Sequence, residues 1–164
     1  MTILNLIYLQ MNNYDIEQLI PQRAPFKMVD KLLSVNGETA ATLLLILPDN
    51  YFLESDGTLA EAGVIEHIAQ SASALAGYLV SEEGASYVPV GYIGEIRNFH
   101  CYRSARVGET LKTTVTREEI VGDIACITGE SWISDERIAE LQMKIYITPV
   151  SYTHLRAHET VLDL

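Results

Sequence analysis

Apolar side chains recur with two different periods in this chain. Residues 58–80 are rich in Ala, Leu and Ile, and apolar positions fall nearly all round the helix that they would form. This predicts a buried helix rather than a half-exposed one. Thr58 and Glu61 have the spacing of a capping box, and Asp56–Gly57 before them indicates a turn. We expect the helix region to end in the Glu-Glu-Gly sequence at 82–84.

Six other segments have the alternation or composition of strands. They are residues 26–35, 39–47, 88–99, 110–117, 124–133 and 138–147. Asn36–Gly37 is a hairpin signal between the first two, and two prolines make residues 21–25 a rigid, non-helical connector. The simplest way to bury the helix is a curved antiparallel sheet wrapped round it, which is an α+β fold. Because such a sheet leaves edges exposed, we expect a dimer.

Composition agrees with a single globular domain, which we place at residues 11–149. The chain has 164 residues, 48% of them hydrophobic and 20% charged, so a sizeable core is expected. Its net charge of −11 argues against nucleic acid as a partner. Cys101 and Cys126 are too few for a disulfide framework and lack metal-binding spacing. A reduced, cytoplasmic protein is therefore expected.

The two ends of the sequence differ from the predicted domain. Residues 1–10 are apolar, but they are too short to span a membrane and lack signal-peptide features. We interpret them as read-through from upstream and expect no membrane anchor. Residues 150–160 resemble the translation of a transposase-type sequencing adapter, so we interpret 150–164 as a non-native tail. His154 and His158 have the spacing of a helical metal pair, but no further ligands converge on them and no metal is expected.

The predicted helix carries a few polar side chains on adjoining faces. Glu66 and Gln70 are one turn apart on one face, and His67 and Ser71 lie on the neighbouring face. A carboxylate on a buried helix costs free energy unless it is paired, hydrogen-bonded or useful. We interpret Glu66 as a functional carboxylate; the alternative is a glutamate that reaches solvent or a structural partner.

Three motifs together resemble a known family. Residues 16–30 are similar to the opening of the 3-hydroxyacyl-[acyl-carrier-protein] dehydratases, residues 65–70 match their helix motif, and residues 107–111 resemble the start of one of their strands. The motifs keep the family's order over about residues 16–147. Within this superfamily the chain is most similar to the divergent dehydratase-like proteins of aryl-polyene and flexirubin pigment clusters.

The resemblance implies a hotdog-fold dimer with two acyl tunnels at the subunit interface. Its substrate would be a 3-hydroxyacyl thioester held by the phosphopantetheine of an acyl carrier protein, with no other cofactor, in fatty-acid or polyene-type biosynthesis. In the family, a histidine of one subunit and a carboxylate of the other remove the α-proton and protonate the departing hydroxyl. The product is the trans-2-enoyl thioester. Glu66 falls at the carboxylate position.

The family's histidine position is occupied here by Gln22, which does not titrate. Three interpretations remain open. His67 replaces the missing imidazole; or Glu66 alone drives an elimination or a thioester hydrolysis, with Gln22 orienting the substrate or a water; or the chain binds acyl thioesters as the non-catalytic half of a heterodimer. An acyl thioesterase is thus the competing enzyme class.

Other residues are candidates for substrate contact. With Gln70 we include Phe26, in the opening motif, and Gly63, which lies two residues after the family's helix glycine position. Gly91 and Gly94 indicate either a bulge or a tunnel wall. The nearby aromatic residues Tyr92, Phe99 and Tyr102 either line an acyl tunnel or pack in the core. We interpret His100 as packed or exposed rather than catalytic.

Basic residues are concentrated in the segment from Arg97 to Arg117, where Glu109 is the only acid. Arg97, Arg103 and Arg106 are therefore predicted to dock an acidic carrier protein or a phosphopantetheine phosphate. A solvated edge strand that resists aggregation is an equally good interpretation.

Overall fold

The computed structural model of the chain describes residues 14–148. The interpretations of residues 1–10 and 150–164, including that of the pair His154 and His158, lie outside this part of the chain.

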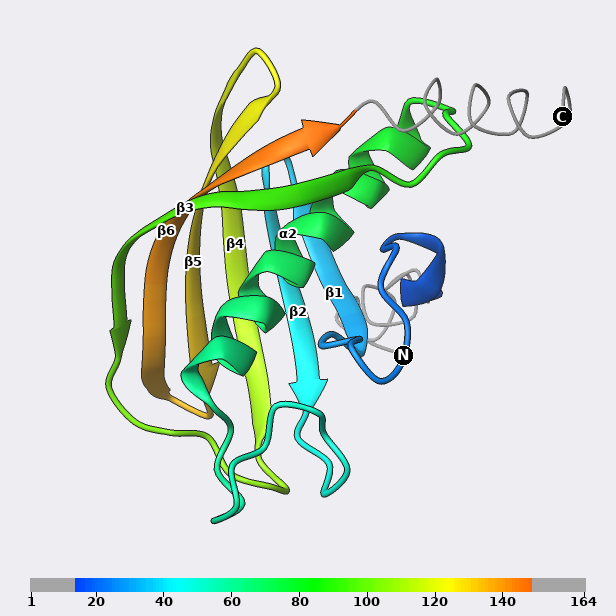
Figure 1. The fold of residues 1–164 in the computed structure, drawn as a ribbon. Helices are drawn as coiled ribbons and strands as arrows, with labels where there is room; N and C mark the ends of the chain where they lie inside the picture. The colour runs from blue at the N-terminus through cyan, green and yellow to red at the C-terminus, as the bar shows by residue number, and fades with distance from the viewer. Residues whose placement is uncertain (1–13, 149–164) are drawn as a thin grey trace, which may run out of the picture.

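In the described residues, six strands form one curved antiparallel sheet (Figure 1). They are β1 (Lys31–Asn36), β2 (Thr39–Leu45), β3 (Val90–Cys101), β4 (Thr110–Val121), β5 (Ile124–Ile133) and β6 (Glu136–Thr148). Their order across the sheet is β1-β2-β4-β5-β6-β3. The predicted β1–β2 hairpin is present, and its Gly37 has a φ of 59°, which favours glycine.

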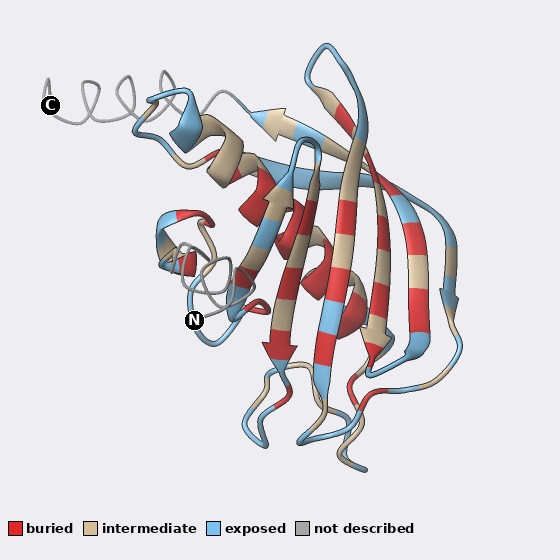
Figure 2. Cartoon of the chain, turned by 180° about the vertical axis from the view of Figure 1, so that it is seen from behind, coloured by how far each residue is buried: buried red, intermediate tan, exposed pale blue. Residues whose placement is uncertain are grey.

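The helix α2 (Glu61–Glu82) lies across the concave face of this sheet, and the 3-10 turn η1 (Ile16–Gln18) precedes β1 (Figure 1). Figure 2 shows buried residues on the helix and at alternating positions of the central strands. In β5 every second residue is buried, as expected for a strand with one face on the core. The prediction of a curved sheet wrapped round one long helix is confirmed, and the fold is a hotdog fold.

Two glycines set how closely the helix approaches its neighbours. A Cβ at Gly129 of β5 would collide with the Ile68 side chain, so the absence of one lets α2 settle on the sheet. A Cβ at Gly77 would collide with the backbone carbonyl of Leu19, just after η1. Close packing of α2 therefore depends on glycine on both sides.

The predicted capping box is wrong. The N-cap of α2 is Ala60, which makes no side-chain capping bond. Thr58 instead bonds to Asp56 through its backbone N–H and its hydroxyl, at 3.0 and 2.6 Å, and it forms an isolated β-bridge with Arg106. The loop before the helix is thus held by tertiary pairing, which overrides the local signal.

The predicted first strand begins too early. Residues 26–30 are not in a strand, and β1 begins at Lys31. The backbone of Phe26 and Met28 bonds instead to the Gln70 side chain of α2. This segment is therefore held against the helix through its backbone.

Within residues 14–148, no helix has both the length and the hydrophobicity needed to cross a membrane.

Candidate functional site

A largely apolar cavity of about 270 Å³ lies between α2 and the sheet. Small residues of the helix, Ala69, Ala72 and Ala76, form one wall. Aliphatic residues of β5 and β6 form another, and residues at the start of β3 close it. Among the described residues that line this cavity, Glu66 and Arg117 alone carry a charge. A concave, largely apolar space with few polar groups is typical of a site for an apolar ligand.

Glu66 reaches this cavity from the first half of α2, where it is half-buried. Gln70, one turn later, donates a hydrogen bond of 2.7 Å from Nε2 to Glu66 Oε1. Gln70 is itself fully buried: its Nε2 also donates to the Phe26 carbonyl at 2.8 Å, and its Oε1 accepts from the Met28 N–H at 2.6 Å. A buried amide with all these partners is rigid, so it fixes one carboxylate oxygen of Glu66.

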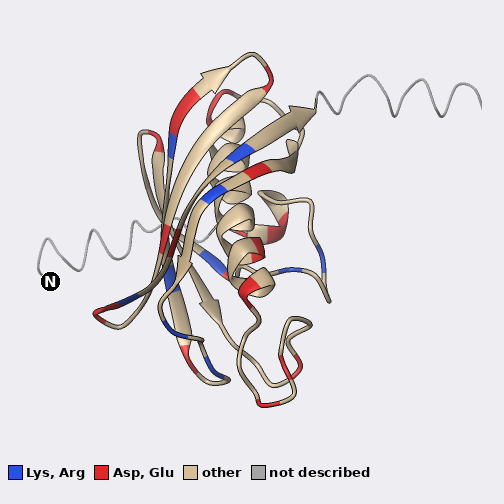
Figure 3. Ribbon diagram, turned by 60° about the vertical axis from the view of Figure 1, so that its left-hand side comes forward, with Lys and Arg blue, Asp and Glu red and all other residues tan. Residues whose placement is uncertain are grey.

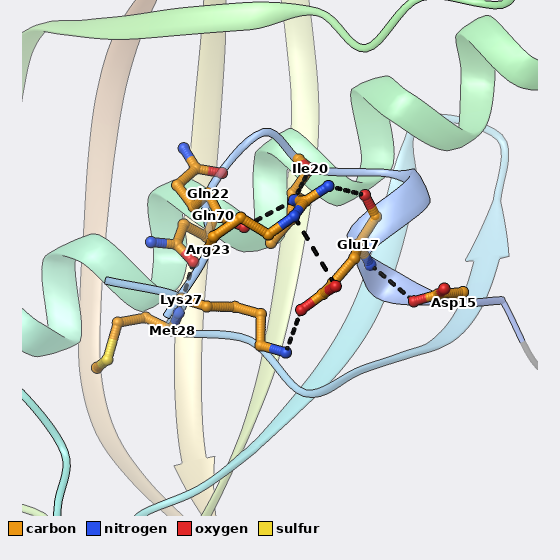
Figure 4. Close-up of polar contacts among 8 residues, drawn as sticks. All are labelled: Asp15, Glu17, Ile20, Gln22, Arg23, Lys27, Met28 and Gln70. Carbon is orange, nitrogen blue, oxygen red and sulfur yellow. Dashed lines mark hydrogen bonds and ion pairs between the residues drawn. The ribbon is translucent and has the colours of Figure 1, made fainter. Parts of the chain in front are cut away.

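Gln22 reaches the same cavity from the connector before β1. Figure 4 shows how the connector is held: Arg23 donates to the carbonyls of Ile20, Gln22 and Glu17, and Lys27 pairs with the Glu17 carboxylate at 3.1 Å. Oε1 of Gln22 is buried and has no partner within residues 14–148. A buried acceptor without a partner is costly, so the amide can gain from a ligand or water that donates to it.

His67 is also fully buried, but it does not line the cavity. Its Nδ1 lies 2.6 Å from the Met28 carbonyl, and its Nε2 lies 2.8 Å from the Thr113 hydroxyl of β4. The carbonyl can only accept, so Nδ1 carries the proton and Nε2 accepts from Thr113. Burial lowers the pKa of His67 to about 4, so the ring is neutral. The structure makes His67 a bridge between connector and sheet and does not bring it to the cavity.

The structure separates the predicted substrate contacts. Gly91 lines the cavity, whereas Gly94 lies against the Tyr146 ring and does not line it. Gly63 packs beneath Phe52, where an added Cβ would come within 2.6 Å of the Phe52 Cβ. Phe26 accepts a hydrogen bond from Gln70 through its carbonyl, and the residue is 51% exposed.

The aromatic residues near β3 also divide. Tyr92 lines the cavity, Phe99 packs against the core, and Tyr102 is exposed and stacks on His100 with 6.0 Å between ring centroids. Core packing, the alternative that the sequence left open, thus describes Phe99 alone.

The basic residues predicted to dock a carrier protein differ in how free they are. Arg97 pairs with Glu95 at 2.7 Å. Arg103 pairs with Glu109 at 2.9 Å and with Glu136 at 3.0 Å, and these carboxylates raise the pKa of its guanidinium. The side chain of Arg106 is exposed and makes no ion pair in the described part of the chain. Figure 3 shows acidic positions interspersed with the basic ones rather than a continuous basic patch.

Two features of the site escaped the sequence. In the sequence, Ala69, Ala72 and Ala76 are small residues spaced along one face of the helix. Such a pattern indicates close helix packing as often as it indicates a cavity wall. Arg117, which the sequence grouped with the basic segment, lines the cavity. The alternation of β4 was the available signal, because Leu111, Thr113 and Val115 on the same face are all buried.

A family profile described as ApeP dehydratase, ApeP-like, matches residues 14–155. No protein with curated annotation matches the chain significantly.

Solved structures match the fold at low sequence identity. One is the dehydratase heterocomplex ApeI:P from Xenorhabdus doucetiae, with a TM-score of 0.76, 18% identity, and coverage of 87% of this chain and 95% of that chain. Another is a hypothetical thioesterase with coenzyme A from Streptococcus pneumoniae, with a TM-score of 0.58, 7% identity and coverage of 72% and 84%. PaaI of the E. coli phenylacetic acid degradation operon has a TM-score of 0.55, 11% identity and coverage of 71% and 81%.

Proposed function

The chain belongs to the ApeP-like dehydratase family, and from this premise we propose that it is a subunit of a 3-hydroxyacyl-carrier-protein dehydratase in polyene-type or fatty-acid biosynthesis. Its substrate is a 3-hydroxyacyl thioester held by phosphopantetheine, and the product is the trans-2-enoyl thioester. The observation that carries the proposal is Glu66, a lone carboxylate positioned by Gln70 on an apolar cavity.

Dehydration needs two proton transfers. A base takes the α-proton as the C=C bond forms, and an acid protonates the 3-hydroxyl as its C–O bond breaks, so that water leaves. Glu66 can perform one transfer. Gln22 cannot perform the other, because an amide does not titrate, and His67 lies away from the cavity.

We therefore propose that the second group is a histidine of a partner hotdog subunit. The heterocomplex of the Xenorhabdus protein supports this division between two chains. Gln22, with its unpartnered buried oxygen, then binds substrate rather than moving a proton. We place the reaction in the cytoplasm, in agreement with the free thiols of Cys101 and Cys126.

The decisive variant is Glu66→Gln, which keeps the shape of the side chain and removes its proton chemistry. The wild-type chain is mixed with a hotdog dehydratase subunit that retains the histidine, and enoyl product is followed by mass spectrometry of the carrier protein. Loss of one proton-transfer group should lower the rate by about 10²- to 10⁴-fold. Glu61→Gln, at an exposed position of the same helix, is the matched control and should keep the wild-type rate. Full activity of Glu66→Gln would refute the assignment.

A second candidate function is thioester hydrolysis. The observation that favours it is the unpartnered Gln22 oxygen on the Glu66 cavity, where a water could be oriented by both side chains. Incubation of the chain alone with a saturated acyl thioester tests this: release of free thiol indicates a thioesterase. Formation of neither enoyl product nor thiol, alone or with the partner, indicates a non-catalytic subunit.

A further inference from the structure

Arg117 gives the cavity a second charged residue besides Glu66. Gly129 of β5 is opposite Val115 of β4 and packs on Ile68, so these residues are at one level of the helix. Arg117 lies two residues further along β4 on the same face. In this direction β4 runs toward the level of the C-terminal half of α2 (Figure 1). Glu66 lies on the N-terminal side of Ile68. The two charged residues therefore line the cavity from different elements and on opposite sides of the Ile68 level.

The guanidinium of Arg117 is only partly used by the protein. Its Nε donates to Glu38 Oε2 at 2.5 Å, and its backbone N–H bonds to the Glu38 carbonyl at 2.9 Å. Within residues 14–148 its two terminal nitrogens have no partner, although the side chain is only 22% exposed. The sheet register shifts between Arg117 and Glu119, and a bulge of this kind redirects a side chain.

A ligand that filled the cavity with hydrocarbon alone would displace water from these nitrogens. Ala125 and Ile127 beside Arg117 are apolar, and a terminal methyl group would leave both guanidinium nitrogens unpaired. An oxygen atom at the far end of the ligand would accept from them. Because Glu38 already balances the charge, a neutral hydroxyl or carbonyl suits this position better than a second carboxylate, which Glu38 would repel.

We propose that Arg117 determines specificity by binding an oxygen-bearing group at the distal end of the acyl chain. The inference rests on the proposed function, since it requires the thioester end of the ligand to lie near Glu66. Arg117 thereby selects among acyl thioesters without taking part in the chemistry.

The test uses saturated acyl-pantetheine thioesters that end in either a hydroxyl or a methyl group. The two compounds are matched in length, and the pair is prepared at several chain lengths. Calorimetry measures the dissociation constant of each. Wild-type protein should bind the hydroxyl compound roughly 10-fold more tightly at the length that spans the cavity, as expected for a hydrogen bond to a charged group. Arg117→Met should lose this preference while still binding the methyl compound. Arg137→Met, at an exposed arginine outside the cavity that also pairs with carboxylates, should keep it.

Glu38→Gln removes the ion pair but keeps the guanidinium, so it should retain the preference even if the β1–β2 hairpin is less stable. Equal binding of the two thioesters by wild-type protein at every length would overturn the inference and leave the proposed function intact. Retention of the preference by Arg117→Met would also overturn it. Binding of neither compound, with the histidine-bearing partner subunit present as well as without it, would overturn both.

Discussion

At the scale of single residues, Glu66 and His67 are adjacent in the sequence but face different surroundings. Successive residues of an α-helix are rotated by about 100° about its axis, so the two side chains point in different directions. Glu66 reaches the cavity, whereas His67 reaches the Met28 carbonyl and the Thr113 hydroxyl. Thr113 in turn lies 2.6 Å from the Ser131 hydroxyl, so the imidazole lies within a buried polar chain that runs from the Met28 carbonyl to Ser131 of the sheet.

His67 predicts how stability depends on pH. Its pKa is lowered by burial from the ordinary value of about 6.5 to about 4. Below pH 6.5 the unfolded chain therefore binds a proton that the folded chain does not, and the free energy of unfolding falls as the pH decreases toward 4. The loss is about 3 kcal/mol for a shift of this size, measurable by urea unfolding at each pH.

The matched variants are His67→Gln and His100→Gln. His67→Gln should have a lower free energy of unfolding than the wild type at neutral pH. This difference should shrink as the pH falls from 6.5 to 4, because only the wild type loses stability through proton uptake by His67 in the unfolded chain. His100 is exposed, so its replacement should leave the slope unchanged. An unaltered slope in His67→Gln would show that other groups cause the pH dependence.

Arg106 is the residue at which carrier docking is best tested, because Arg97 and Arg103 are held in ion pairs within the chain. Arg106→Glu should weaken binding of an acidic carrier protein by about 5-fold, the size typical of an exposed charge pair. Titration at low and high salt should show that the difference shrinks with salt. Lys31→Glu, an exposed cation on β1, is the control; an equal effect there would indicate a general charge effect.

At the scale of elements, the helix is set into the sheet by small residues. Gly77 is on the buried face of α2 beside the Leu19 carbonyl. In an exposed helix, replacing glycine by alanine stabilises by about 0.5–1 kcal/mol. At Gly77 the added Cβ meets backbone that cannot easily move, so the sign should reverse.

Gly77→Ala is therefore expected to lower the free energy of unfolding by about 1–3 kcal/mol, the range for overpacking. Thermal and urea unfolding measure this directly. Ser81→Ala, at an exposed position near the end of the same helix, should change stability by less than about 0.5 kcal/mol. Stabilisation by Gly77→Ala would mean that the helix and the segment around Leu19 separate easily.

At the scale of the whole molecule, the two edges of the sheet differ. β1 is short and carries Lys31, features that protect an edge strand from pairing. β3 is twelve residues long and exposes apolar side chains, among them Ile96 at 38% and Tyr92 at 61%. We therefore expect association with a second hotdog subunit along β3, whose first residues line the cavity.

Ile96→Glu should lower the molecular mass in solution, measured by light scattering, because it places a charge in this apolar surface. Ile120→Glu on β4 is the matched control, since Ile120 is 47% exposed but lies away from β3. A lower mass for both variants, or for neither, would exclude β3 as the specific interface.

The sequence was sufficient for elements whose signals are local and repeated. The apolar run of α2 and the alternation of β5 specified their own structures, since each pattern extends over several turns or residue pairs. Their combination also predicted the curved sheet. The position of Glu66 on the helix followed from the same periodicity, together with the family resemblance.

The tertiary structure decided everything that depends on which surfaces meet. Thr58 has the sequence of a helix cap, but its pairing with Arg106 removed it from that role, and Phe26 left its predicted strand because Gln70 binds its carbonyl. Arg117 belongs to a basic run in the sequence, yet the register of β4 turns it into the cavity. Spacing along the chain determines the face on which a residue lies, but contacts between distant segments determine what that face meets.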